Sequence, residues 1–259
     1  MYFSLFKISL NEYFIYRLNF ILWRLRMMIN ILIPIFLWSS VYEADLYKKN
    51  QIISYFLIFH ILYSLIYATR THEIAENIRS GEIINILTKP ISFFKYHFIR
   101  DLADKVLNFS FSIIEVFILW FFLGKNIIFI NQNVNFVLFF YFIIIGIFIN
   151  FFTSILFSFI GFVSPEYWAP RFLFMVITNL LSGIFIPLQL LPEKIYNILL
   201  YTPFPYFSFI PVQIILNKQF LNQTTEKSVF IGFFWSIFLW FLVIFIWKKS
   251  LKSFSFWGK

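Results

Sequence analysis

Long apolar runs separated by short charged segments are the feature of this sequence that most restricts its fold. A helix needs roughly 20 apolar residues to cross a hydrocarbon core of about 30 Å. Backbone groups inside a bilayer must also find partners within the protein. The runs therefore predict an all-α polytopic membrane protein with six transmembrane helices. The predicted spans are Met27–Tyr42, Ile52–Ala68, Val106–Leu123, Phe136–Val163, Phe172–Leu191 and Val229–Trp247.

Composition indicates a single membrane domain over residues 1–259. Hydrophobic residues make up 61% of the chain and charged residues only 13%, against roughly 25% charged in an ordinary soluble domain. The net charge of +9 does not indicate nucleic-acid binding, because the basic residues flank apolar runs, where they interact with lipid head groups. The chain has no cysteine, and His60, His72 and His97 are scattered. We therefore expect no metal site and no cofactor.

The distribution of lysine and arginine predicts which parts of the chain face the cytoplasm. With the N-terminus inside, fifteen basic residues lie on the cytoplasmic side and six on the other, in agreement with the positive-inside rule. We expect a multi-pass protein of the cell membrane (the inner, cytoplasmic membrane) with both termini in the cytoplasm. The six outer basic residues are Lys48, Lys49, Lys125, Lys194, Lys218 and Lys227.

The pattern of residues 1–26 predicts a helix that lies in the membrane interface. Apolar residues recur every three or four positions from Phe3 to Leu25, with polar residues such as Lys7 and Asn11 between them. This pattern is typical of an amphipathic helix at a membrane surface. The alternative is that the segment simply extends the first spanning helix.

Residues 69–105 are the most highly charged part of the chain and separate two apolar runs. The pattern predicts two short amphipathic helices with a break at Ser80-Gly81 and a stop at Lys89-Pro90, because glycine permits a sharp turn and the residue before a proline disfavours helix. Such a segment could be a solvated cytoplasmic loop. It could also be a surface that another protein binds.

Residues 192–216 are apolar but contain four prolines, which argues against a continuous spanning helix. We expect two short helices broken near Pro203-Phe204-Pro205. They would form a re-entrant hairpin that dips from the outer face before the last span, with its backbone buried in protein or in contact with water. The four prolines are Pro192, Pro203, Pro205 and Pro211.

Glu115 is the only acidic residue inside a predicted span. A charge at mid-bilayer costs roughly 2.5–3.5 kcal/mol on insertion scales, so this carboxyl group should face protein or water. Two interpretations remain open. Glu115 is either a polar site on a translocation path or a neutral carboxyl group hydrogen-bonded to a neighbouring helix through His60, Asn150 or Asn179. An intramembrane enzyme is disfavoured because neither Glu115 nor His60 has a motif partner.

Two stretches of the chain resemble a known family. The first is EIAENIRSGEIINILTKPIS, from Glu73 to Ser92, with an acidic helix, an IRSG turn and a KP stop. The second is SGIFIP, from Ser182 to Pro187, followed by the proline-rich stretch LLPEKIYNILLYTPFPYFSFIPVQIILNK. In this order and spacing they resemble the cytoplasmic loop and the fifth span of ABC-2 type permeases. The resemblance covers nearly the whole chain.

The resemblance implies the permease subunit of an ABC transporter, which forms half of a translocation pathway. In this family the loop docks on a separate ATP-binding subunit, so ATP hydrolysis is expected there and the chain itself is not expected to be an enzyme. The chain has no GxxxxGK[ST] phosphate-binding motif, which agrees with this division. Applied to the loop, the resemblance assigns ATPase coupling to Glu73, Ile74, Glu76, Ile78, Arg79, Gly81 and Ile83.

Within this set, we expect Ile74, Ile78 and Ile83 to enter a groove of the ATPase, and Glu76 and Arg79 to contact its rim. A second permease, identical or different, is expected to complete the pathway, and the proline-rich hairpin to close it at the outer face. The family favours export, and walls rich in Phe, Ile and Leu favour an amphipathic or lipid-like cargo. The alternative is a channel or a non-transporting assembly protein. That alternative would not explain the IRSG turn and the KP stop.

Overall fold

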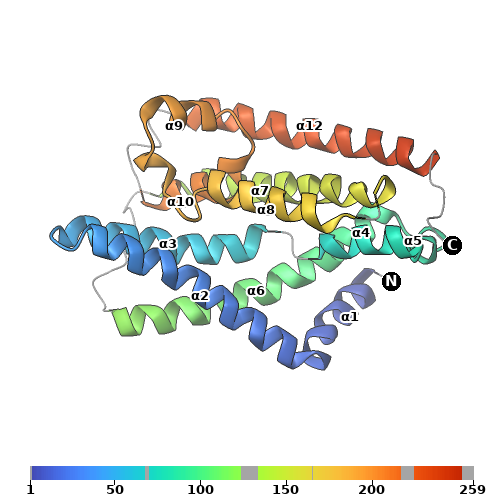
Figure 1. The fold of residues 1–259 in the computed structure, drawn as a ribbon, viewed down its shortest axis with the longest axis horizontal. Coiled ribbons are helices and arrows are strands. Elements are labelled where there is room, and N and C mark those ends of the chain that lie inside the picture. Colours follow the sequence, from blue (N-terminus) through green and yellow to red (C-terminus); the bar gives the residue numbers. More distant parts are fainter. Residues whose placement is uncertain (1, 68–69, 124–133, 165, 217–224, 253–259) are drawn as a thin grey trace.

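The computed structural model describes residues 2–67, 70–123, 134–164, 166–216 and 225–252, and all regular structure in these ranges is helical (Figure 1). The α-helices are α1 (Tyr2–Ile15), α2 (Arg17–Val41), α3 (Leu46–Ile66), α4 (Thr71–Ser80), α5 (Ile83–Leu87), α6 (Phe93–Leu123), α7 (Phe136–Ser158), α8 (Trp168–Leu181), α9 (Glu193–Leu199), α10 (Phe209–Leu216) and α12 (Thr225–Lys252). The 3-10 segments are η1 (Phe159–Phe162), η2 (Leu188–Leu190) and η3 (Phe204–Phe207).

Four of the described helices are long and apolar enough to cross a membrane. They are α2, α6, α7 continued by η1, and α12. α8 is apolar but has only 14 residues, and α3 has 21 residues but begins with the polar sequence LYKKNQ. The structure therefore shows a polytopic helical membrane protein, whereas spans at α3 and α8 stay predictions.

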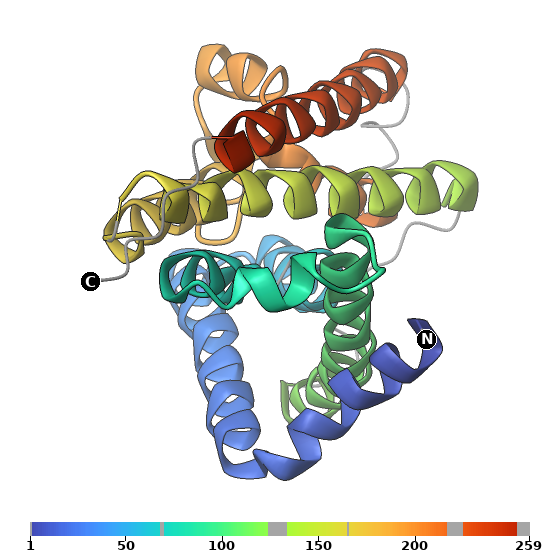
Figure 2. The ribbon, with the colours of Figure 1, turned by 90° about the vertical axis from the view of Figure 1, so that its right-hand side faces the viewer.

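The long helices alternate in direction along the chain (Figure 1). α2, α6 and α8 run one way and α3, α7 and α12 run the other way. As a result α1, α4, α5 and the last turn of α12 lie at one end of the molecule, which we call the α4 end. α9 and the last turn of α6 lie at the opposite end, which we call the α9 end. Figure 2 shows α4 and α5 lying across the ends of the longer helices.

α3 occupies the centre of the main hydrophobic core. It packs against α2, α6, α7 and α10, and its residues Tyr55, Phe56 and Leu57 are at most 2% exposed. A helix that is apolar on every side is stable only when neighbours surround it. The core around α3 therefore joins α2, which precedes the charged residues 69–105, to α7 and α10, which follow them.

The N-terminal helix ends earlier than the sequence predicts. α1 stops at Ile15 and α2 starts at Arg17, so residues 17–26, which we expected in the interfacial helix, form the first part of a 25-residue helix. The physical reason is that Arg24 is buried against α6 and pairs with a carboxylate there, which draws this stretch into the helix bundle. The exposed apolar residues of α1, which suit a membrane interface, are Tyr2, Phe3, Ile8, Phe14 and Ile15.

The predicted fifth span, Phe172–Leu191, is not one continuous helix. α8 ends at Leu181, and a turn with Gly183 at φ 90° leads to η2. The carbonyl groups of this turn lie beyond the helix and need hydrogen-bond partners from elsewhere. Here Tyr55 of α3 donates a hydrogen bond to the Gly183 carbonyl at 2.9 Å, and the Trp38 indole of α2 donates to a carbonyl further along the turn at 2.9 Å. These bonds stabilise the early end of α8.

Candidate functional site

The α4–α5 segment is a compact unit at the α4 end. Ile74, Ile78 and Ile83 are 0%, 2% and 1% exposed, and they belong to a second hydrophobic cluster with residues of α6, α7, η1 and α12. We expected these three side chains to enter a groove of a partner protein. The structure instead buries them within the chain, because α7 with η1, and α12, extend far enough to cover the inner face of α4 and α5.

The opposite side of this unit carries both apolar and charged side chains. Ile84 and Leu87 of α5 are 44% and 40% exposed. Glu76 and Arg79 of α4 are exposed as well, and their contact with the rim of a partner stays a prediction. Helix α4 is thus amphipathic, with its apolar face inward and its charged face outward. We call the exposed set the outer face of α4–α5; it consists of Glu76, Arg79, Glu82, Ile84, Asn85 and Leu87.

Two glycines allow the tight packing of the α4–α5 unit. Gly81 follows α4 with φ 79°, a left-handed conformation that costs other residues roughly 1–2 kcal/mol. The helix break therefore lies where the sequence predicts it. Gly161 of η1 lies against α4, since a Cβ atom there would be 2.8 Å from the Ala75 carbonyl oxygen. A larger residue at this position would push η1 away from α4.

An ionic network joins α1, α4 and α6 at the α4 end. Arg70, which precedes α4, pairs with Glu12 of α1 and with Asp104 of α6, the latter at 2.8 Å. Arg100 of α6 pairs with Glu12 and with Glu73 of α4, both at 3.1 Å. Burial opposes the charge on Arg70, but the carboxylates of Asp104 and Glu12 raise its pKa above the usual range. The network therefore fixes the N-terminal helix to the start of α4.

The first residue of α4 is also tied to α7 and α8. Arg171 of α8 donates hydrogen bonds to the hydroxyl groups of Ser158 and Thr71, both at 3.0 Å. The Ser158 hydroxyl, at the end of α7, donates to the Thr71 carbonyl at 2.6 Å. The start of α4 is thus connected to α1, α6, α7 and α8, so α4 cannot move without changing contacts to four helices.

Deeper in the bundle, Glu115 of α6 meets side chains from two other helices. Its carboxylate accepts two hydrogen bonds from the Arg24 guanidinium of α2, one of them at 2.7 Å, and it lies 2.7 Å from Nε2 of His60 on α3. The three residues are at most 6% exposed. His60 was among the partners considered from the sequence, whereas Arg24 was not. Arg24 thus places a guanidinium group directly against this carboxyl group.

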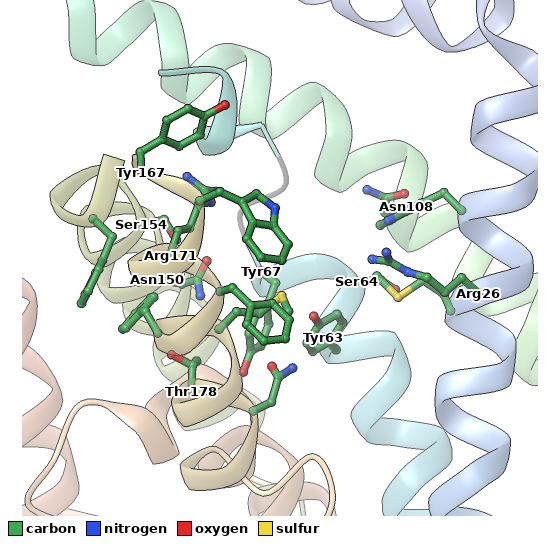
Figure 3. Close-up of a pocket in the computed structure, with 18 residues that line it drawn as sticks. Arg26, Tyr63, Ser64, Tyr67, Asn108, Asn150, Ser154, Tyr167, Arg171 and Thr178 are labelled. Carbon is green, nitrogen blue, oxygen red and sulfur yellow. The ribbon is translucent and has the colours of Figure 1, made fainter. Parts of the chain in front are cut away.

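A cavity of about 540 Å³ lies among α2, α3, α6, α7 and α8 (Figure 3). Its volume is in the range of small-molecule binding sites. Arg26 from α2 and Arg171 from α8 lie on opposite walls. Asn150 and Asn179, which we considered as partners of Glu115, both line this cavity. Among the described residues, no acidic side chain contributes to its wall.

Three polar residues in the cavity wall have atoms without a hydrogen-bond partner among the described residues. Asn108 is completely buried, and both its amide nitrogen and its amide oxygen are unpaired. Thr178 and Asn179 each have one unpaired oxygen atom. An unpaired buried polar group costs roughly 1–3 kcal/mol, and native structures keep few of them without water or a ligand to bind. The cavity therefore offers hydrogen-bond donors and acceptors to a guest molecule.

The proline-rich segment lies at the α9 end. α9 and α10 flank η3, so two short helices are separated by a turn that contains Pro203 and Pro205. Pro192 is exposed before α9, whereas Pro205 and Pro211 are buried. α10 packs against α3 and α7 inside the core. Protein contacts thus surround η3 and α10, whereas most of α9 is exposed. Insertion of the segment from the outer face of a membrane stays a prediction.

Sequence reasoning selected Glu115 on α6 but missed the polar stripe to which it belongs. The stripe repeats every three or four residues, which places it on one face of the helix, and this periodicity could have been detected. By contrast, Arg26 and Arg171 resemble ordinary flanking charges, and nothing in the sequence places them across one cavity. The stripe consists of Asp101, Asp104, Lys105, Asn108, Ser112 and Glu115, each at most 6% exposed.

The long apolar helices and the polar cavity among them define a polytopic helical membrane protein. In the described part of the chain, no group of three or more His, Cys, Asp or Glu side chains could hold a metal ion. The family model described as ABC-2 family transporter protein matches residues 24–258. The chain therefore belongs to the ABC-2 transporter family and is a transmembrane permease of that type. No curated protein matches the chain.

Proposed function

We propose that this permease is the membrane subunit of an ATP-driven exporter and that it couples to a separate ATP-binding subunit. The observation that carries the proposal is the outer face of α4–α5. Ile84 and Leu87 of α5 are exposed there, as are the charged residues Glu76 and Arg79 of α4. Protein interfaces combine an apolar anchor with a polar rim in this way. The membership in the ABC-2 family supports an ATPase as the partner.

The attachment of α4 to the bundle supports coupling as well as binding. A partner can drive a conformational change only if it contacts two states of the permease differently. The start of α4 is connected to α1 and α6 through Arg70 and to α7 and α8 through Arg171. A displacement of the α4–α5 unit by the ATPase would therefore reach four helices at once.

The pairing and orientation of the permease follow from the same proposal. A second permease, identical or different, would complete the translocation pathway. The α4 end would face the cytoplasm, because the segments gathered there carry most of the basic residues. Both termini would then be cytoplasmic, and the proline-rich segment would close the pathway at the outer face. Export is favoured because the ABC-2 family is mostly exporting.

The test of this function is co-purification of the permease with its ATP-binding subunit, co-expressed in the same cells. We expect Ile84→Asp and Leu87→Asp to remove the complex, because loss of an interface anchor costs roughly 2 kcal/mol or more, equivalent to about 30-fold in affinity. Ile84→Leu is the matched control and should keep the complex.

Ile78→Asp separates docking from folding. Ile78 is 2% exposed inside the chain, so this variant should lower the thermal stability of the purified permease, whereas Ile84→Asp should leave it unchanged. If Ile84→Asp and Leu87→Asp retained the ATPase and transport at the wild-type level, the outer face of α4–α5 would not be the docking surface, and the segment would be a solvated loop.

A further inference from the structure

The cavity among α2, α3, α6, α7 and α8 has an excess of positive charge. Arg26 and Arg171 face it from opposite walls (Figure 3), and none of the described lining residues is acidic. Arg171 is held in place by the hydroxyl groups of Ser158 and Thr71, neither of which carries a charge. Cations in a membrane protein are stable when they meet anions or water. The charge distribution therefore selects an anionic guest.

The unpaired polar groups lie in the wall of the same cavity. Asn108, with two unpaired amide atoms, comes from α6, and Thr178 and Asn179 come from α8. The Asn108 amide nitrogen and the Thr178 hydroxyl group can donate to oxygen atoms of a head group, and the amide oxygens of Asn108 and Asn179 can accept from its hydroxyl groups. Their burial makes such bonds specific, because a guest without matching groups leaves them unpaired. The guest should therefore carry several oxygen atoms near its charge.

Much of the remaining wall is aromatic. Large rings provide apolar contact area at low cost in side-chain entropy. A small inorganic anion would leave this part of the cavity uncovered, whereas a chain or ring system attached to the anion would cover it. Six of the aromatic lining residues are Trp23, Tyr63, Tyr67, Phe157, Trp168 and Phe174.

From these three observations we infer that the cavity binds an amphipathic organic anion. Its charged head group would lie between Arg26 and Arg171 and bond to Asn108, and its apolar body would lie along the aromatic wall. The assignment of this molecule as the exported cargo rests on the proposed function. The binding itself does not depend on an ATPase.

The binding test uses the purified full-length chain in nanodiscs of zwitterionic phosphatidylcholine, with radiolabelled dodecyl phosphate as the probe. Empty nanodiscs correct for partition into the lipid. We expect saturable binding with one site per chain. Unlabelled dodecyltrimethylammonium and inorganic phosphate are the competitors, because the first lacks the anionic head and the second lacks the apolar body. Neither should displace the probe at concentrations at which unlabelled dodecyl phosphate does.

Two variants connect this binding to the cavity. Arg26→Gln should weaken the binding of dodecyl phosphate about tenfold or more, because hydrogen bonds to a charged group are among the stronger polar contacts. Arg17→Gln is the matched control, since it removes the same charge from the same helix at a position that does not line the cavity and should leave the affinity unchanged. Asn108→Leu should also weaken binding, yet it should raise or preserve the thermal stability of the ligand-free chain, because it removes unpaired buried atoms.

Three results would overturn the inference. The first is the absence of saturable binding, and the second is that dodecyltrimethylammonium or inorganic phosphate displaces the probe as effectively as dodecyl phosphate does. The third is that the Arg26→Gln and Arg17→Gln variants bind the probe with equal affinity. A loss of stability in Asn108→Leu together with unchanged binding would show that Asn108 is structural and would remove it from the site. If the chain binds the probe but does not assemble with an ATPase, the proposed anion site stands and the proposed exporter function is refuted. Assembly without binding would refute only the cavity site.

Discussion

At the scale of single residues, the cluster of Arg24, His60 and Glu115 shows how the bundle accommodates ionised groups inside its core. A buried ion pair contributes little net stability compared with apolar residues of the same volume, since desolvation offsets the attraction. Removal of one partner is far more costly, because the other charge stays buried without compensation. The cluster therefore specifies which helices meet, as it joins α2, α3 and α6 at one point.

We therefore expect the stability of the permease to depend strongly on whether Arg24 and Glu115 are both present, both replaced, or only one of them replaced. Arg24→Leu should destabilise the purified permease by about 3–5 kcal/mol, and the double variant Arg24→Leu with Glu115→Leu should recover most of that loss. Thermal unfolding in detergent, followed by circular dichroism, measures both changes. A double variant that unfolds as early as Arg24→Leu alone would show that uncompensated charge is not the cause.

At the scale of elements, the α4–α5 unit shows which features a sequence can predict. The break at Gly81 and the stop before Pro90 depend on local backbone preferences, and the structure has both where the sequence predicts them. The orientation of Ile78 was predicted wrongly, because its burial depends on residues of η1 and α12 that lie far away in the sequence. The exposed anchor Ile84 was missed for the same reason.

The conformation of Gly81 leads to a prediction for this unit. Proline cannot adopt φ 79°, since its ring fixes φ near −65°, so Gly81→Pro should open the junction of α4 and α5 and speed tryptic cleavage after Arg79 at least several-fold. Gly81→Asn is the matched control, because asparagine enters the left-handed region more readily, and it should have a smaller effect. Cleavage at the wild-type rate in Gly81→Pro would contradict the observed helix end.

At the scale of the whole molecule, hydropathy predicted the long helices well because each needs only its own run of apolar residues. It predicted α8 poorly, since the end of that helix depends on bonds from Tyr55 and Trp38 of other helices. The cavity could not be predicted at all, because it arises where five helices meet. The alternation of helix directions nevertheless places the α4 end and the α9 end on opposite sides of the bundle.

The orientation of these two ends can be tested by cysteine labelling, because the chain has no cysteine of its own. Asn85 of α5 and Tyr201, which follows α9 by two residues, are both exposed, and α5 and α9 lie at opposite ends. Ser208 is completely buried and unsuitable for labelling. A membrane-impermeant maleimide added to intact cells should label Tyr201→Cys, and Asn85→Cys only after permeabilisation. The reverse pattern would refute a cytoplasmic α4 end.

The shared cluster of α4, α5 and α12 limits how this permease can be re-engineered. Trp247 of α12 stacks on Phe93 at the start of α6, with ring centroids 4.0 Å apart, and Ile78 and Ile83 pack in the same cluster. A loop transplanted from a relative would bring inner residues shaped for another α7 and α12, and would leave voids or overlaps there. Chimeras that redirect the permease to a different ATPase should therefore exchange only the outer face of α4–α5 and retain the native inner face.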